Sequence, residues 1–471
     1  MGRIPLLARL ALSAPLALAA WGGFCAQSPP GTERDGGEAP PILMEAPPIS
    51  LENQPLPTGT ALRFQDAVDE ALARNLGYAQ AQAREAAVAG RGQSAVQDLF
   101  PTMDVGLSAS RTTGVVQGSF GDFKDSSFHT YAAPHWTVAY QLNLGARIEE
   151  ALASSKEARA ATYQTQDARQ RLLLAVTRAY QRLTLAWHGL NISQKLEMDS
   201  ASFLTLTLDR FEAGVGEGAI VERARAKLAL DRSQRLRAEA LWEGASVDLA
   251  VMLRRDPTVF LVPEDTALRP AQWVGREGPA EVADTSARPD VKGALMEAEA
   301  AKLRFGAARW DLFAPKLALW WTGSRISDTW GDFRSGRRTG AALYWSFALG
   351  QIGRMRTRRA EAEESALRSS AAAERAAGEA VIASQNLEAA LQTQEQARIG
   401  LEAAERGHGL SLARFQGGLA TALEVFDAED TLAQARFNFA RTISDGNVSQ
   451  AELLAAQGRL DRAALLRDSV P

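Results

Sequence analysis

The sequence predicts an α+β membrane protein made of two tandem repeats, each with long helices and two strands. Three observations support this fold class. Sequence features recur in the same order in the two halves of the 471-residue chain. Long segments rich in Ala, Leu, Glu, Arg and Gln favour extended helices. Short segments alternate apolar and polar residues, as β-strands with two different faces do.

Two similar segments reveal the duplication. "RFEAGVGEGAIVERARAKL" occupies residues 210–228, and "RFQGGLATALEVFDAEDTL" occupies residues 414–432. "DLFP" at Asp98–Pro101 likewise returns as "DLFAP" at Asp311–Pro315. Because these matches keep the same order along the chain, they indicate an internal repeat rather than chance similarity.

The duplication divides the chain into six predicted regions. A signal peptide and an extended Pro-rich leader precede the first repeat, a Pro-containing linker separates the two repeats, and a short tail ends the chain. These regions are residues 1–25 (signal peptide), 26–59 (leader), 60–256 (first repeat), 257–287 (linker), 288–458 (second repeat) and 459–471 (C-terminal tail).

Each repeat is predicted to contain a first helix, two strands, a very long helix, a glycine break and a final helix. The helices are expected at 62–99, 147–212 and 219–256, and again at 288–312, 353–415 and 421–458. The first long helix carries a narrow coiled-coil seam at Leu172, Val176, Ala179, Leu183, Ala186 and Leu190. A helix of about 65 residues would be roughly 100 Å long, too long for one globular domain.

The strands have one apolar and aromatic face. In "WTVAYQLNL", Trp136, Val138 and Tyr140 alternate with polar or small residues and Asn143 falls on the opposite face, while Trp345 occupies the apolar face of "ALYWSFAL". Aromatic residues of this kind sit at membrane interfaces, so we expect these four apolar side chains to face lipid. The alternative is a soluble β-sandwich edge attached to a helical bundle.

Four strands cannot cross a membrane alone, because unpaired backbone groups are too costly in lipid. Two chains would supply eight strands, which enclose almost no lumen, whereas three would supply twelve and could hold an aqueous channel. The sequence therefore predicts a trimeric 12-stranded β-barrel if the strands form a pore.

The N-terminus resembles an export signal. Arg3 and Arg9 precede an apolar run at 10–20 that is short for a membrane span. Cys25, the only cysteine, could be the lipidated first residue of a mature lipoprotein. Phe24 is bulky for the position before such a cysteine, so a bystander cysteine is the alternative.

Composition and motifs argue against several function classes. The formal net charge of −4 gives no sign of a nucleic-acid partner. The four histidines are scattered, and no catalytic, cofactor-binding or metal-binding constellation is legible. "GVGEGA" at 214–219 lacks the Lys-Ser/Thr ending of a phosphate loop. We therefore expect no enzymatic activity, no cofactor and no metal.

Taken together, residues 60–458 resemble the outer-membrane efflux protein family, the TolC-like channels. The similarity is carried by "LRFQDAVDEALARNL" at 62–76, "LFPTMDVGLSASR" at 99–111, "RPDVKGALMEAEAA" at 288–301 and the two duplicated segments. The resemblance implies a homotrimer whose barrel lies in outer-membrane lipid and continues as a periplasmic coiled-coil tube of helices. It also implies two partners, a periplasmic adaptor (membrane fusion) protein and an inner-membrane transporter.

The resemblance assigns the glycine breaks to the periplasmic tips of the tube. These tip loops, which dock on the adaptor in the family, contain Gly214, Gly216 and Gly218 in one repeat and Gly417 and Gly418 in the other. A hairpin between long helices requires a residue that adopts positive φ, which glycine does at low cost. The residues that flank the tips are Arg210, Phe211, Arg414 and Phe415.

Two acidic residues follow the second tip. Glu424 and Asp427 match positions that form an acidic ring at the entrance in the family; alternatively, they are acids at a helix start, which the helix dipole favours. Some members close the tip with a Tyr and an Arg, but Phe415 and Ala420 stand here. Arg210 and Arg414 could replace that lock or could cap the helix ends.

The predicted function is an outer-membrane exit duct for efflux or secretion. The alternative is an exported periplasmic adaptor or structural protein without a pore. An adaptor has one helical hairpin, whereas two hairpins and two strand pairs are expected here. The sequence leaves open whether the cargo is a drug, a metal ion or a polypeptide.

Overall fold

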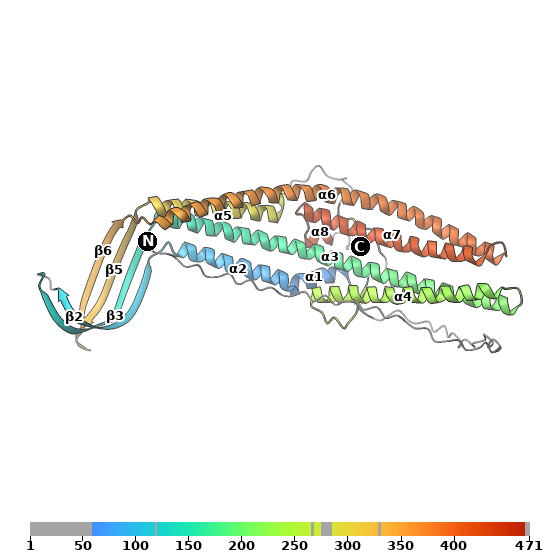
Figure 1. The fold of residues 1–471 in the computed structure, drawn as a ribbon, viewed down its shortest axis with the longest axis horizontal. Coiled ribbons are helices and arrows are strands. Elements are labelled where there is room, and N and C mark those ends of the chain that lie inside the picture. The colour runs from blue at the N-terminus through green and yellow to red at the C-terminus, as the bar shows by residue number, and fades with distance from the viewer. Residues whose placement is uncertain (1–58, 118–119, 265–267, 275–284, 328–330, 467–471) are drawn as a thin grey trace, which may run out of the picture. The chain divides into compact units, whose positions relative to one another are not determined.

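Long helices make up most of the structure, and a four-stranded sheet lies at one end of them (Figure 1). The computed structural model describes residues 59–117, 120–264, 268–274, 285–327 and 331–466. The predicted signal peptide with Cys25, nearly all of the leader and the end of the tail lie outside these residues.

The helices follow the same order in the two halves. The first half has α1 (Phe64–Arg74), α2 (Leu76–Gln97), α3 (Leu144–Glu212) and α4 (Gly218–Leu253). The second half has α5 (Pro289–Phe313), α6 (Leu349–Gln416), α7 (Ala422–Ala456) and α8 (Arg462–Leu465), and a 3₁₀ turn at Thr285–Ala287 precedes it. The domain boundaries given above stay a prediction.

The first predicted helix, 62–99, is wrong as one element because it is broken at Asn75. The Asn75 backbone is extended, and its side-chain oxygen accepts a hydrogen bond from the Tyr78 backbone N–H at 3.2 Å. Asparagine is among the residues preferred at a helix N-cap, since this bond satisfies an otherwise unpaired N–H group. The chain therefore ends α1 and starts α2 at this residue.

The sheet is antiparallel, with strand order β2-β3-β5-β6. Its strands are β2 (Thr102–Gln117), β3 (Phe123–Leu142), β5 (Lys316–Ser327) and β6 (Arg334–Tyr344). β2 and β3 have 16 and 20 residues, longer than the alternation predicted. The strand pair of one half thus joins the strand pair of the other through β3 and β5.

Two strand ends differ from the prediction. β3 ends at Leu142, and Asn143 is the N-cap residue of α3 rather than a strand residue. β6 ends at Tyr344, so Trp345 lies just beyond the strand, and Leu349 already belongs to α6. Alternating apolar residues continue through both junctions, which is why the pattern alone placed these residues in strands.

A second, smaller sheet was not predicted. β1 (Thr60–Leu62) and β4 (Leu261–Pro263) are parallel and bring the start of the first repeat to the predicted linker. The buried indole N–H of Trp242 on α4 donates to the Leu261 carbonyl at 3.0 Å. The small sheet therefore packs into the main core rather than standing alone.

The main hydrophobic core lies midway along α3. Leu172, Val176, Leu183 and Leu190 of the predicted seam are buried there with Trp242 and Leu249 of α4. The predicted seam is thus largely buried, but the buried face of α3 is broader than the narrow seam predicted, because Leu173 and Tyr180 are buried as well. No helix in the described residues combines the length and the apolar composition needed to cross a membrane.

Candidate functional site

The turns α3–α4 and α6–α7 share one backbone conformation. Gly214 and Gly418 have φ of +72° and +73°. In the first turn, the N–H groups of Gly214 and Val215 donate to the carbonyls of Phe211 and Arg210, each at 3.0 Å. The second turn has the same two hydrogen bonds. The Gly418 N–H donates to the Phe415 carbonyl, and the Leu419 N–H donates to the Arg414 carbonyl. This is the Schellman arrangement that ends helices at a left-handed residue.

The other predicted tip glycines have different roles. Gly417 is the C-cap of α6 with φ of −77°, a conformation open to any residue. Gly216 lies so close to α3 that an added Cβ would be 2.8 Å from the Phe211 backbone nitrogen. Gly218 is the first residue of α4, where an added Cβ would meet the Phe211 ring at an ordinary 3.4 Å. Positive φ therefore explains one glycine in each turn, not all five.

The two turns pack against each other at the same end of the helices (Figure 1). Phe415 is buried and lies 5.2 Å, ring to ring, from Phe203 of α3. Phe426 of α7 meets the same Phe203 ring at 4.8 Å in an edge-on arrangement. Ala420, at one position of the lock known from some family members, packs against this cluster. Aromatic and aliphatic packing thus joins the hairpins here.

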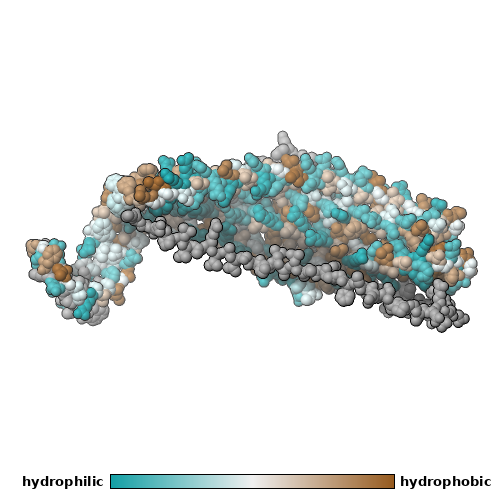
Figure 2. Space-filling view, viewed as in Figure 1, coloured by the Kyte–Doolittle hydropathy of each residue, from teal (hydrophilic) through white to brown (hydrophobic). Residues whose placement is uncertain are grey.

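The outer surface of the turns carries exposed apolar side chains among charged ones such as Glu212 and Glu217. The exposed side chains there include Phe211, Val215, Leu419 and Leu423. Figure 2 shows apolar side chains at this end, whereas polar side chains cover much of the helical surface in view. Val215 and Leu419 occupy equivalent positions just after the two left-handed glycines, and each is at least three-quarters exposed.

Glu424 takes part in a capping box at the start of α7. Its carboxylate accepts from the Thr421 backbone N–H at 3.2 Å, while its own N–H donates to the Thr421 hydroxyl at 3.4 Å. Asp427 is exposed one turn later. The capping box matches the helix-start alternative for Glu424, and the acidic ring stays a prediction. Within the described residues, no cluster of three His, Cys, Asp or Glu side chains could hold a metal.

The sequence reasoning missed a buried charge network just behind the turns. Lys227 of α4 donates to both carboxylate oxygens of Asp231, at 2.8 and 2.9 Å, and to Asp430 of α7 at 2.7 Å. The Ser200 hydroxyl of α3 also donates to Asp231. The Lys-x-x-x-Asp spacing was a visible signal, because residues four apart share a helix face. The contact with Asp430 depends on tertiary packing.

Glu429 is buried beside this network. Burial raises the pKa of its carboxyl to about 7; Lys227 opposes the rise, and Asp199, Asp231 and Asp430 add to it. Three helices, α3, α4 and α7, therefore meet around two nearly buried charges and one carboxyl group that titrates near neutral pH.

The sheet presents one continuous apolar face. Val138 pairs with Met103 on one side and Trp321 on the other, and Tyr140 pairs with Leu319. Paired residues project from the same face of a sheet, and Met103 and Trp321 are exposed.

Two tryptophan rings are in close contact on this face. The Trp136 ring lies edge-on to Trp321 at 4.8 Å and covers Gly323, where any Cβ would collide with the indole. The predicted residues Trp136, Val138 and Tyr140 therefore share a face, whereas Trp345 lies outside the strand. Their contact with lipid stays a prediction.

Residues 67–253 match the family model described as outer membrane efflux protein. The resemblance inferred from the sequence is confirmed. Members of this family are outer-membrane channels and not enzymes, which agrees with the predicted localisation in the outer membrane with a large periplasmic part. No curated protein gives a significant match to the chain.

Solved outer-membrane channels share the fold. The channel OprN has 23% sequence identity and a TM-score of 0.74, with 84% of this chain and 89% of that chain covered. The open state of the Neisseria gonorrhoeae channel MtrE has 20% identity and a TM-score of 0.73, with 85% and 90% covered. VceC from Vibrio cholerae has 18% identity and a TM-score of 0.72, with 84% and 96% covered. The predicted combination of long helices with strands is thus confirmed.

Proposed function

We propose that three copies of this chain form an efflux duct through the outer membrane. The observation that carries the proposal is the sheet, which has two open edges, β2 and β6, and one exposed apolar face. Strand edges in lipid must pair, so β6 of one copy would pair with β2 of the next. Three copies of a four-stranded sheet give a twelve-stranded barrel, wide enough for an aqueous channel.

The helices support the same assembly. α2 packs on α3, α3 on α5, and α5 on α6. The strands joined to these four helices, β2, β3, β5 and β6, have the same order in the sheet. α2 and α6 are therefore the outer members of this row, as β2 and β6 are the edges of the sheet. In α2 only Gly92 is buried. An α6–α2 contact between neighbouring copies would cover these faces and continue the barrel as a helical tube.

The turns at the far end of the helices are the proposed entrance. Their exposed apolar side chains, Phe211, Val215, Leu419 and Leu423, form a surface for a periplasmic adaptor protein. An inner-membrane transporter would complete the assembly and select the cargo. This docking surface is built on the glycine turns, with Gly214 and Gly418 fixing its shape.

Fractionation and conductance measurements test the proposal. The full chain should be recovered from the outer membrane only with detergent, should have the mass of a trimer, and should conduct ions in planar lipid bilayers. A water-soluble monomer in the periplasm would contradict the proposal and favour the adaptor alternative. A trimer that binds membranes without conducting would contradict the pore while leaving the assembly intact.

A further inference from the structure

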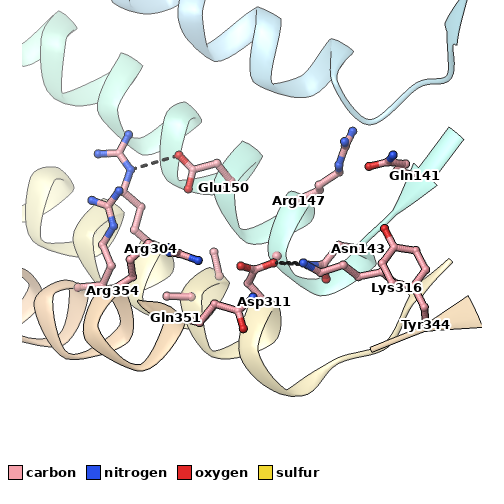
Figure 3. Close-up of a pocket in the computed structure, with 14 residues that line it drawn as sticks. Gln141, Asn143, Arg147, Glu150, Arg304, Asp311, Lys316, Tyr344, Gln351 and Arg354 are labelled. Atoms are coloured by element: carbon pink, nitrogen blue, oxygen red, sulfur yellow. Dashed lines mark hydrogen bonds and ion pairs between the residues drawn. The ribbon is translucent and has the colours of Figure 1, made fainter. Parts of the chain in front are cut away.

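A pocket of about 400 Å³ lies where the sheet meets the helices (Figure 3). Gln141, Lys316 and Tyr344 reach it from the ends of β3, β5 and β6. Side chains from the first turns of α3 and α6 and from the last turns of α5 form the remaining walls. Segments from both halves of the chain therefore build one cavity.

Most of the charged side chains that line the cavity are basic. Five cationic side chains and two carboxylates face the cavity: Arg147, Arg304, Lys316, Arg354 and Arg358 against Glu150 and Asp311. Both carboxylates have a cationic partner in the lining, but Arg304, the partner of Glu150, also pairs with Glu157. Asp311 pairs with Lys316 at 2.9 Å and accepts from Asn143 at 3.0 Å, and Glu150 accepts from Arg304 at 3.3 Å.

Two guanidinium groups retain an uncompensated charge. Arg147 donates to the backbone carbonyl of Asp98, which is a neutral acceptor. The exposed Arg354 side chain forms no hydrogen bond or ion pair with the residues that the structure describes. By contrast, Arg358 pairs with Glu361 at 2.9 Å. The cavity therefore offers two guanidinium groups, one from α3 and one from α6, that form no ion pair with the described residues.

Two helix N-termini and the side-chain amide of Asn143 also favour an anion as the ligand of this cavity. Asn143 is the N-cap of α3, and Gln351 lies in the first turn of α6, so the positive ends of two helix dipoles border the cavity. The C-terminal turn of α5 opposes them, but its Asp311 is already neutralised. The side-chain oxygen of Asn143 is buried without a hydrogen-bond partner among the described residues. An anion that carries one O–H group could use both the guanidinium donors and this acceptor.

The strand register places the cavity on the face of the sheet opposite the apolar one. Gln141 pairs with Ala318, two residues from Lys316, and Lys316 pairs with Tyr344. The apolar face carries Tyr140 and Leu319 instead. Since successive residues of a strand point to opposite faces, the three strand residues of the cavity share the polar face. In the proposed barrel, that face borders the lumen.

We infer that this pocket binds phosphate groups of solutes inside the duct, at the junction of barrel and helical tube. The inference rests on the proposed function for its lumenal position, whereas the binding of phosphate rests on the pocket itself. Guanidinium groups donate two parallel hydrogen bonds to oxyanions, so arginine suits phosphate recognition. A trimer would hold three such pockets at one level of the lumen.

The binding test uses purified full-length protein and inorganic phosphate in calorimetric titrations. Arg354→Gln should weaken phosphate binding about tenfold, since one charge-assisted contact is lost. It should not impair folding, because Arg354 has no hydrogen bond or ion pair to lose among the described residues. Arg356→Gln is the matched control, because Arg356 is also exposed and lies about 200° around α6 from Arg354. Its affinity should stay within about twofold of the parent value, a change too small to represent a lost charge-assisted contact.

Two results would contradict the proposed phosphate site. One is that the parent protein shows no saturable phosphate binding, and the other is that Arg354→Gln and Arg356→Gln weaken phosphate binding equally. Arg147→Gln gives an independent check from α3 and should also weaken binding. Reversal potentials in a KCl gradient supply a second readout, in which Arg354→Gln should shift selectivity toward K⁺ and Arg356→Gln should not. Phosphate binding without conductance would contradict the channel but keep the site, whereas conductance without phosphate binding would do the reverse.

Discussion

The guanidinium carbon of Arg210 lies 4.7 Å from the centroid of the Phe415 ring and so connects the ends of α3 and α6. Arg414 and Phe211 are the equivalent residues in the duplicated segments, and their side chains are placed differently. Arg414 donates to the Leu419 carbonyl of its own turn at 3.3 Å, and Phe211 is half-exposed. The duplicated Arg-Phe pair has therefore diverged into one inward contact between hairpins and one outward surface.

This asymmetry predicts unequal effects of two matched substitutions. Phe415→Ala should lower the free energy of unfolding by about 3 kcal/mol, since it opens a cavity beside Phe203 and Phe426 and removes the ring under Arg210. Phe211→Ala should cost less than about 1 kcal/mol, because surface substitutions usually do. Denaturant titrations measure both values. Equal losses would contradict the assignment of Phe415 to the core between the hairpins.

Glu429 predicts a pH dependence of stability. Its pKa in the folded protein, about 7, exceeds the ordinary value of 4.5 because burial disfavours the carboxylate. The folded state therefore binds the proton more tightly than the unfolded state. Between about pH 4.5 and 7, only the unfolded state releases the proton, so stability from this group falls as pH rises and then levels off.

Glu429→Gln tests this prediction, because glutamine is neutral at every pH. Melting temperatures of the parent and the variant should agree near pH 4, and the variant should become progressively more stable than the parent up to about pH 8. A constant difference at every pH would show that the substitution acts through packing and not through titration of the carboxyl group.

The Schellman turns predict a difference between adjacent glycines. Gly418→Ala forces a Cβ into a left-handed conformation and should lower the free energy of unfolding by about 1 kcal/mol. Gly417→Ala is the control: Gly417 has φ of −77°, and its nearest contacts to an added Cβ are at an ordinary 3.6 Å. It should be neutral or slightly stabilising, since alanine restricts the unfolded chain. If both variants lose equal stability, the turn has a different conformation.

Features encoded locally were predictable from the sequence. The seam of α3 and the glycine turns depend on residues close together in the chain, so the bounds of the long helices came within a few residues of the structure. β1 and β4 have only three residues each, too few for any alternation to be recognised. The end of β3 before Asn143 was missed because apolar alternation persists into the helix start.

Contacts between distant segments were not predictable in the same way. The Lys227–Asp231 pair lies on one helix and has a recognisable spacing, but its third member, Asp430, comes from the other half of the chain. The basic pocket is likewise assembled from α3, α5, α6 and three strand ends. No spacing rule links Arg147 to Arg354, because the two halves are brought together by tertiary contacts, such as the pairing of β3 with β5 and the packing of α3 on α5.

The barrel proposal predicts opposite outcomes for neighbouring residues of β3. Val138 shares the apolar face with Trp136 and Trp321, so Val138→Arg would place a charge in lipid. Such a charge costs about 2–4 kcal/mol at the bilayer midplane and less toward the interface. Thr137 lies on the opposite face, where it pairs with Asp104 and its hydroxyl lies 3.3 Å from that of Thr322. Thr137→Arg would therefore face the lumen beside a carboxylate. We expect Val138→Arg to reduce the yield of trimer in the outer membrane several-fold and Thr137→Arg to change it little, as judged by detergent extraction and native electrophoresis. Equal yields from the two variants would argue against a lipid-facing role for the Val138 face.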